Sequence, residues 1–554
     1  MASDPINLKT FVARAKKIHA HWVSNKQNPK VWKNADAICI VAGATDENAV
    51  MYSGSSTFHR YLFSLELPST IVLFTEKKVV ILTSKKKKEI LEKAQFDGDV
   101  ALEVIEKVKA EEYGANCATL IAAVKASLDG ATLGTLLKES PGGKFAASWA
   151  KALEKTSIAT VDCSTGINLA LAVKTEDEIM NIRKASHLSY KAMKAFSKRM
   201  WTVVDEDKGT FKHSELAAEI DANLEDPTER MQVKNVDKDM VESCYTPTVQ
   251  SGPKCKVSLN EGAEMENEKM SFDLITCQLG ARYDSYCSNV ARTYIVNPPD
   301  CMEKAYMLLL EVQQVCLSAM KDSVSLLNVY NAAKKHIEAH GKDMLQYFTP
   351  NCGTGLGLMI RDASHVMSHK NKRVMKAGMV FNLCVGFQDV PVALGKKDAK
   401  KPKVGARALP TYTLLLADTV LVGKDEAEVL TKSAKKNWST VAQTLDESEE
   451  EEEEEEEENL SRREKRDRAQ AEATAKNIDL DQKRQEIMKK KAADVKRRNL
   501  ARKQKGSASD EVAQKDSDAE LQISAYSSVQ RIPASIKPTR LTVDTENQAV
   551  LLPI

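Results

Sequence analysis

The side chains best suited to chemistry in this chain are its cysteines, its spaced histidines and two long runs of charge. Eleven cysteines lie between Cys39 and Cys384, and none belongs to a Cys-X-X-Cys pair. Thiolates bind soft metals, so four cysteines could hold zinc if they shared one cleft. The odd total and the scattered spacing are more typical of reduced, buried thiols in the cytosol or nucleus. The four candidates are Cys277, Cys287, Cys352 and Cys384.

Two histidine pairs have the i, i+4 spacing that places two imidazoles on one helix face: His336 with His340, and His365 with His369. Neither pair has the glutamate directly after the first histidine that zinc peptidases use, so we interpret both as incidental. The glycine-rich segment at 353–358 resembles a phosphate-binding loop, but no Gly-Lys-Ser or Gly-Lys-Thr follows. A tight stretch of backbone is the better interpretation.

An acidic run spans 446–458, where twelve of thirteen residues are Asp or Glu, and it cannot form a hydrophobic core. Clustered carboxylates compete with DNA phosphate for Lys and Arg, so this run could bind a basic protein; a solvated spacer is the alternative. The positions proposed for this binding, which the family resemblance given below would assign to histones, are Asp446, Glu447, Glu449, Glu450, Glu451 and Glu458.

A basic stretch follows at 461–505, with 17 Lys or Arg, 7 acidic residues and no Gly or Pro. This composition predicts a helix of roughly 65 Å. It could contact DNA weakly or serve as a nuclear import signal, although it has no aromatics for base stacking. A charged helix facing solvent or a partner is the alternative. The import residues would be Lys489, Lys490, Lys491, Lys496, Arg497 and Arg498.

The chain has 554 residues, 42% of them hydrophobic, which is enough for several domains. No run of 18 apolar residues and no secretory signal is present, so we expect a soluble, intracellular protein without membrane contact.

The predicted parts are an N-terminal α/β lobe (1–170), an α+β domain (171–440), an acidic disordered linker (441–460), a basic helix or coiled coil (461–506), a flexible linker (507–535) and the first strands of a β domain (536–554).

Hydrophobic patterning predicts the elements that position these residues. Short apolar strands are expected in the lobe at 37–42, 71–74 and 79–82. The sequence Thr-Glu-Asp-Glu from Thr175 to Glu178 predicts a capping box at the start of a long helix. Residues spaced by three and four should form its buried stripe. These are Ile179, Ile182, Ser186, Ser189, Met193 and Phe196.

Strands in the second domain are expected within 271–296, interrupted by Gly280, and again at 379–386 and 411–422. Helices should occupy 301–340. This alternation predicts layers of helices on an antiparallel sheet.

The segment from Gln278 to Thr293 resembles the first metal-binding hairpin of the aminopeptidase P and methionine aminopeptidase superfamily, which has the pita-bread fold. The resemblance implies a creatinase-like N-terminal lobe and five metal ligands: two aspartates, a histidine and two glutamates. Each ligand position holds an uncharged side chain that is not the family's ligand, so the resemblance implies a pseudo-peptidase without a metal cofactor. A second family histidine corresponds to Arg361. The five altered positions are Gln278, Asn289, Thr354, Cys384 and Ala417.

The order of a peptidase-like domain, a glutamate run, a basic helix and a new β piece resembles the large-subunit family of the FACT histone chaperone. Residues 286–293, 417–422, 84–87 and 541–554 carry the same resemblance. It implies a non-enzymatic, nuclear and chromosomal subunit that binds core histones and reorganises nucleosomes in transcription, replication and repair. The implied partner is a small HMG-box subunit, and the alternative function is an active metallo-aminopeptidase or creatinase-type hydrolase.

The chain stops at Ile554, near the start of that family's PH-like heterodimerisation domain. The resemblance therefore leaves open whether the heterodimer forms and which histones are bound. The empty cleft could still bind a peptide, and Gln278, Thr354 and Arg361 are its expected residues.

Overall fold

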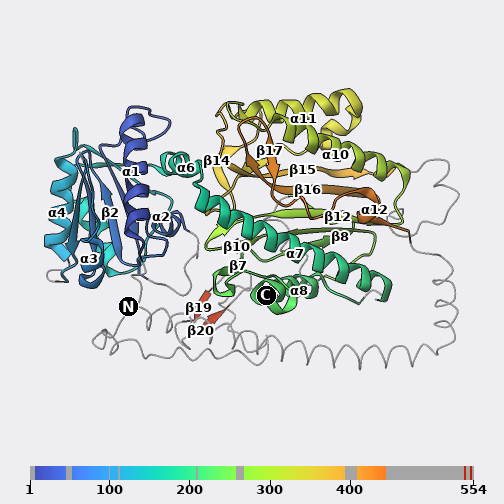
Figure 1. Ribbon diagram of the computed structural model, residues 1–554, viewed down its shortest axis with the longest axis horizontal. Helices are drawn as coiled ribbons and strands as arrows, with labels where there is room; N and C mark the ends of the chain where they lie inside the picture. Colours follow the sequence, from blue (N-terminus) through green and yellow to red (C-terminus); the bar gives the residue numbers. More distant parts are fainter. Residues whose placement is uncertain are drawn as a thin grey trace. The chain divides into compact units, whose positions relative to one another are not determined.

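The computed structural model describes residues 6–44, 53–98, 100–109, 113–206, 210–257, 268–393 and 409–444, and two strands near the end of the chain (Figure 1). The acidic run, the basic helix and the flexible linker that the sequence predicts lie outside these residues. Within the described part, no helix combines the length and the apolar character needed to span a membrane.

The N-terminal lobe contains a six-stranded mixed sheet with the order β4-β3-β2-β1-β5-β6. The middle pairs β1–β2 and β2–β3 are antiparallel, whereas β3–β4, β1–β5 and β5–β6 are parallel. The three predicted strands are confirmed as β1, β2 and β3. The bounds are Ala37–Ala42 (β1), Thr70–Phe74 (β2), Lys78–Thr83 (β3), Ala101–Glu106 (β4), Thr132–Thr135 (β5) and Ala159–Asp162 (β6).

Two hydrophobic clusters cover the two faces of this sheet, because alternate strand residues point to opposite sides. Ile38 and Ile40 pack with Phe11 and Phe58 of the first two helices. Cys39 and its neighbours on the other face pack with the fourth and fifth helices. The helix bounds are Leu8–Asn25 (α1), Gly54–Phe63 (α2), Lys85–Leu91 (α3), Gly114–Lys125 (α4), Lys144–Glu154 (α5) and Ser164–Ala172 (α6).

The second domain begins with the long helix α7 (Glu176–Glu206). The predicted capping box is confirmed: the Thr175 amide donates to Glu178 Oε2 at 2.8 Å, and the Glu178 amide donates to Thr175 Oγ1 at 3.4 Å. All six residues of the predicted stripe are buried. The long helix therefore starts and packs as the sequence predicts.

A nine-stranded sheet forms the centre of this domain, with the order β14-β13-β15-β16-β12-β9-β8, β17 beside β16 and β18 beside β12. Every pairing is antiparallel except that of β12 with β18, which confirms the predicted architecture. The bounds are Thr248–Ser251 (β8), Leu274–Leu279 (β9), Val290–Val296 (β12), Gly353–Gly355 (β13), Asp362–Val366 (β14), Val380–Pro391 (β15), Thr411–Val422 (β16), Ala427–Val429 (β17) and Ala442–Gln443 (β18).

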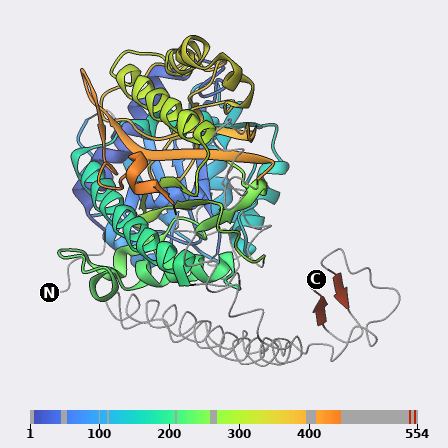
Figure 2. The ribbon, with the colours of Figure 1, turned by 90° about the vertical axis from the view of Figure 1, so that its right-hand side faces the viewer.

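Helices cover both faces of the nine-stranded sheet. In both views α10 (Asp300–Ala319) and α11 (Leu326–His340) lie on one side of β15 and β16, and α7 lies on the other (Figures 1 and 2). Helix α8 (His213–Glu225) packs beside α7, while α9 (Pro227–Arg230) and α12 (Trp438–Val441) are single turns.

The predicted hairpin at 271–296 is present as β9 and β12, with an insertion. Between them lie β10 (Ala281–Tyr283) and β11 (Tyr286–Cys287), which form a small separate sheet with β7 (Val241–Ser243). The strands nearest the end of the chain, β19 (Thr542–Asp544) and β20 (Ala549–Leu551), pair with each other in antiparallel fashion.

Gly353 occupies a position that other residues would not tolerate. Its φ is +115°, and a Cβ atom there would lie 1.9 Å from the carbonyl oxygen of Asn382. This close approach lets β13 join the sheet edge, so the glycine-rich segment is a tight strand connection.

We predict that Gly353→Ala lowers the free energy of unfolding by more than about 1 kcal/mol, because both the backbone angle and the neighbouring carbonyl must shift. Urea unfolding measures the loss. Gly142→Ala is the matched control, since a Cβ there meets no atom within 4 Å. Equal stabilities of the two variants would contradict the expectation.

Candidate functional site

The five positions that the family resemblance equates with metal ligands, called the altered positions below, lie on or next to neighbouring strands of the nine-stranded sheet. Gln278 is in β9, Asn289 directly precedes β12, Thr354 is in β13, Cys384 is in β15 and Ala417 is in β16. The sheet thus brings together residues that the chain separates by up to 139 positions (417 − 278).

Strand register places these side chains on one face of the sheet. Ala291 pairs with Gln278 on one side and with Ala417 on the other, and Ala417 pairs in turn with Cys384. Residues directly opposite one another in a sheet point to the same face, so this row crosses four strands on one side.

The remaining two positions join the same face. Asn289 lies two residues before Ala291, and Thr354 pairs with Asn382, which lies two residues before Cys384. Residues two apart in a strand share a face. The Asn289 amide nitrogen donates to Asn382 Oδ1 at 3.1 Å, which agrees with this placement.

Neutral hydrogen bonds occupy the site. Tyr245 donates its hydroxyl proton to Asn289 Oδ1 at 2.5 Å, and Gln278 Nε2 donates to the Val257 carbonyl at 3.4 Å. Asn289 is fully buried. Burial raises the pKa of Tyr245 well above its usual value, and nearby cysteines add to the effect, so the phenol stays neutral. No motif or spacing in the sequence predicted a role for Tyr245.

The four cysteines proposed for a zinc site do not form one cluster. The Cys287 thiol donates to the Leu358 carbonyl at 3.4 Å, and the electrostatic neighbours of Cys352 are Cys316 and Cys384. Burial raises the pKa of Cys384 to about 12, which disfavours the thiolate that a metal would need. None of the eleven cysteines, all of which the structure describes, forms a disulfide. Among the described residues, no group of three or more His, Cys, Asp or Glu side chains is placed to hold a metal ion.

The two histidine pairs behave differently from each other. The rings of His336 and His340 stack with 4.2 Å between their centroids. His365 does not meet His369; its Nδ1 lies 2.6 Å from Asp362 Oδ2. Neither pair gains the further ligand that a metal site in the described part of the chain would require.

The three residues proposed for a peptide cleft differ in accessibility. Gln278 and Thr354 are only 2% and 8% exposed, whereas Arg361 is exposed. Of the three side chains, only that of Arg361 is freely accessible to a ligand.

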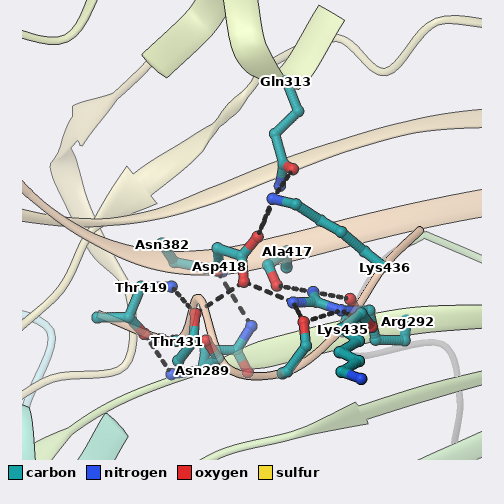
Figure 3. Close-up of polar contacts among 12 residues, drawn as sticks. Asn289, Arg292, Gln313, Asn382, Ala417, Asp418, Thr419, Thr431, Lys435 and Lys436 are labelled. Atoms are coloured by element: carbon teal, nitrogen blue, oxygen red, sulfur yellow. Dashed lines mark hydrogen bonds and ion pairs between the residues drawn. The ribbon is translucent and has the colours of Figure 1, made fainter. Parts of the chain in front are cut away.

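A buried ion pair lies beside the altered positions and was not predicted from the sequence (Figure 3). Arg292 Nη2 is 2.7 Å from Asp418 Oδ1, and their side chains are 0% and 1% exposed. The same carboxylate accepts from Lys436 Nζ at 2.9 Å, Gln313 Nε2 at 3.0 Å and Thr431 Oγ1 at 2.7 Å. Every oxygen of the buried carboxylate is thus satisfied.

The Arg292 guanidinium also binds the backbone of the strands that carry the altered positions. It donates to the carbonyls of Ala291 in β12 at 2.7 Å and Ala417 in β16 at 2.8 Å, and also to that of Ala434, outside the strands, at 2.6 Å. The available sequence signal was a lone arginine and a lone aspartate inside otherwise apolar strands, since buried charges are rare unless paired.

Fold and site together define a domain of the pita-bread peptidase class. Residues 180–441 match metallopeptidase family M24. The Xaa-Pro dipeptidase from Bacillus anthracis superimposes with a TM-score of 0.53 at 18% identity, over 78% of this chain and all of that chain. At this identity the likeness describes the fold alone.

Residues 6–166 match the FACT complex subunit SPT16 N-terminal lobe domain. The N-terminal domain of FACT complex subunit SPT16 from chickpea, Cicer arietinum, superimposes with a TM-score of 0.70 at 31% identity, over 79% of this chain and 99% of that chain. FACT complex subunit SPT16 from Arabidopsis thaliana is 30% identical over 99% of this chain and 51% of that protein. The chain therefore belongs to the SPT16 family, and it spans about half the length of the curated relatives it matches.

We predict that Arg292→Met lowers the free energy of unfolding by about 3–5 kcal/mol, because it strips the buried Asp418 carboxylate of its main partner. Arg183→Met is the matched control: Arg183 pairs with Glu428 at 2.5 Å, but both side chains are at least 40% exposed. The control should lose less than about 1 kcal/mol. Similar losses in urea unfolding would show that the buried pair has no special role.

Stability should also fall in acid. Burial alone would raise the pKa of Asp418, but the charges of Arg292 and Lys436 outweigh it and hold the pKa below the usual range. The unfolded chain therefore takes up the proton first, so this contribution is complete above the ordinary Asp pKa and is lost as pH falls towards the folded pKa.

Urea unfolding between about pH 6 and pH 3 measures this slope. Asp418→Asn should be less stable at pH 6 and should show a shallower dependence on pH. Asp425→Asn, at an exposed position in the same region, should retain the wild-type slope. An unchanged slope in the Asp418 variant would contradict the assignment.

Proposed function

We propose that this chain is a non-enzymatic subunit of a FACT-type histone chaperone complex, whose peptidase-like domain binds polypeptide and does not cut it. The supporting observation is that the five altered positions lie together on one face of the sheet. They keep the strand register of a shared site while carrying Gln, Asn, Thr, Cys and Ala.

The chemistry of these five side chains opposes a pair of divalent metals. Two hard cations held close together need anionic oxygen donors to offset their repulsion. Loss of a single outer-shell partner already costs about 10- to 100-fold in metal affinity. The Cys384 thiol is held neutral by burial, and Asn289 is engaged with Tyr245. We therefore interpret the domain as a pseudo-peptidase that lacks all five ligands.

The competing function is an active metallo-aminopeptidase or a metal-free hydrolase of the creatinase type. A hydrolase needs a group that moves a proton near the scissile bond. The two family histidine positions hold Thr354 and Arg361, and neither side chain is a general base at neutral pH. This supports a binding role over a catalytic one.

Family membership supports further proposals about partners and place. We propose that the chain acts in the nucleus, on the chromosome, with a small HMG-box subunit, core histones and nucleosomes, during transcription, replication and repair. The acidic positions at 446–458 would attract histone lysines and arginines, and the basic stretch at 461–505 would serve nuclear import or weak DNA contact. The cleft around Arg361 would accept a partner peptide.

The deciding experiment measures metal content, peptidase activity and histone binding on the same preparation. After incubation with manganese or cobalt and desalting, we expect no stoichiometric metal and no hydrolysis of Xaa-Pro peptides. An authentic Xaa-Pro dipeptidase, treated in parallel, is the positive control. Two ions per chain together with turnover would overturn the proposal.

Labelled histone complexes should bind the full chain, with affinity that falls as salt rises. A variant with neutral Gln, Ser and Gly in place of 446–458 tests the acidic run, and a variant with the basic positions at 489–491 and 496–498 neutralised is its control. Absence of histone binding even at low salt would favour a purely structural scaffold.

A further inference from the structure

A cavity of about 210 Å³ lies between the N-terminal lobe and the second domain. One wall comes from α2, α6 and the loop after β5; the other comes from Tyr286 and residues 356–359. Asn168 Nδ2 joins the two walls through a 3.1 Å hydrogen bond to Asp362 Oδ1. Neither Arg361 nor any of the five altered positions lines this cavity, so it is separate from the site above.

Much of the lining is apolar. Phe58, Ile167 and Leu171 of the lobe face Leu356 and Leu358 of the second domain, and these residues belong to or pack against one hydrophobic cluster. Such walls favour an occupant with an alkyl or aromatic stem.

The more deeply buried cation of the cavity, Lys174, already has hydrogen-bond partners within the chain. Lys174 Nζ donates to the carbonyls of Leu171 at 2.6 Å and Ala172 at 2.9 Å. Burial lowers its pKa, while the carboxylates of Glu178 and Asp362 act against that shift. Lys174 is therefore committed to groups of the chain itself and is not a receptor for an anionic ligand.

Two other carboxylates lack a basic partner. Glu139 accepts hydrogen bonds from the first amides of α2, including that of Gly54, and Asp162 accepts from Ser164 Oγ at 2.8 Å. In the part of the chain that the structure describes, no basic side chain forms an ion pair with either. The exposed Lys138 also lines the cavity, and it forms an ion pair with neither carboxylate.

The cavity lining thus contains four carboxylates and two ammonium groups, which leaves an excess of two negative charges beside the apolar walls. We propose that this cavity receives the side chain of a lysine or arginine from a partner polypeptide. The stem would pack on the apolar walls and the charged head would reach Glu139 and Asp162. The charged lining residues are Glu139, Asp162, Glu178 and Asp362, with Lys138 and Lys174.

Size supports a single side chain as the occupant. Pockets for cofactors and drug-sized ligands enclose about 300–1,000 Å³, which exceeds this cavity. Long basic side chains bury their methylene stems while the charged head stays near polar groups. The inference uses only the lining of this cavity, so it does not depend on the proposed chaperone function.

The test uses blocked heptapeptides of Ala and Ser that differ only at the central residue: lysine, arginine, norleucine or citrulline. Binding to the full chain is measured by calorimetry. The lysine and arginine peptides should bind at least about tenfold more tightly than their neutral counterparts, because each keeps a charge-assisted hydrogen bond. Leu136→Trp, which fills the cavity, and Asp162→Asn should each weaken the basic peptides about tenfold.

Two neighbours provide matched controls. Leu137 is 52% exposed and does not line the cavity, and Asp129 is an exposed acid elsewhere on the lobe. Leu137→Trp and Asp129→Asn should leave binding unchanged. The proposal fails if neutral peptides bind equally well, if no basic peptide binds at about 1 mM, or if the controls weaken binding as much as the cavity variants. Should Leu136→Trp unfold, the Asp162→Asn comparison decides alone.

Discussion

The central constraint of the second domain is that one guanidinium and one carboxylate must meet out of contact with water. Arg292 in β12 and Asp418 in β16 are nearly inaccessible, and isolated charges in such a place would oppose folding strongly. The cost is offset because Arg292 also binds backbone carbonyls of both strands and Asp418 collects three further donors. Only one register of β12 against β16 permits all of these bonds.

That register also holds the five altered positions in place without a bound ligand. Ala417 and Ala291 are opposed because the neighbouring ion pair and the strand hydrogen bonds hold them there. No ligand is needed to position them. The Asn289 amide nitrogen donates to the Asn382 side-chain oxygen, and the Tyr245 hydroxyl donates to the Asn289 side-chain oxygen, so the arrangement carries no charge. The hydrogen bonds and the ion pair therefore hold this face of the sheet together through the chain's own side chains.

Local signals in the sequence predicted local structure well. The Thr175–Glu178 box, the buried stripe of α7 and the apolar runs of β1, β15 and β16 depend on residues close together in the chain, and the structure has them all. The pita-bread architecture was predicted from a family resemblance in the segment from Gln278 to Thr293. The structure tests neither the loss of function at the five positions nor the domain limits. These stay predictions.

Contacts between distant residues could not be predicted in the same way. Arg292 and Asp418 are 126 residues apart, and Asn168 and Asp362 are 194 apart. Their meeting depends on strand register and on how the lobe packs against the second domain, and no periodicity in a single segment encodes either. For this reason the sequence alone could not predict the cavity between the lobe and the second domain.

The eleven cysteines, none of which forms a disulfide, have a practical consequence for handling this chain. Eight are buried and three are partly buried, so the native fold shields them from alkylating and oxidising reagents. Once the fold opens, every sulfur becomes available at the same time and disulfides can form at random. Loss of structure in air would then become irreversible, and thiol labelling would count the fraction of molecules that have opened.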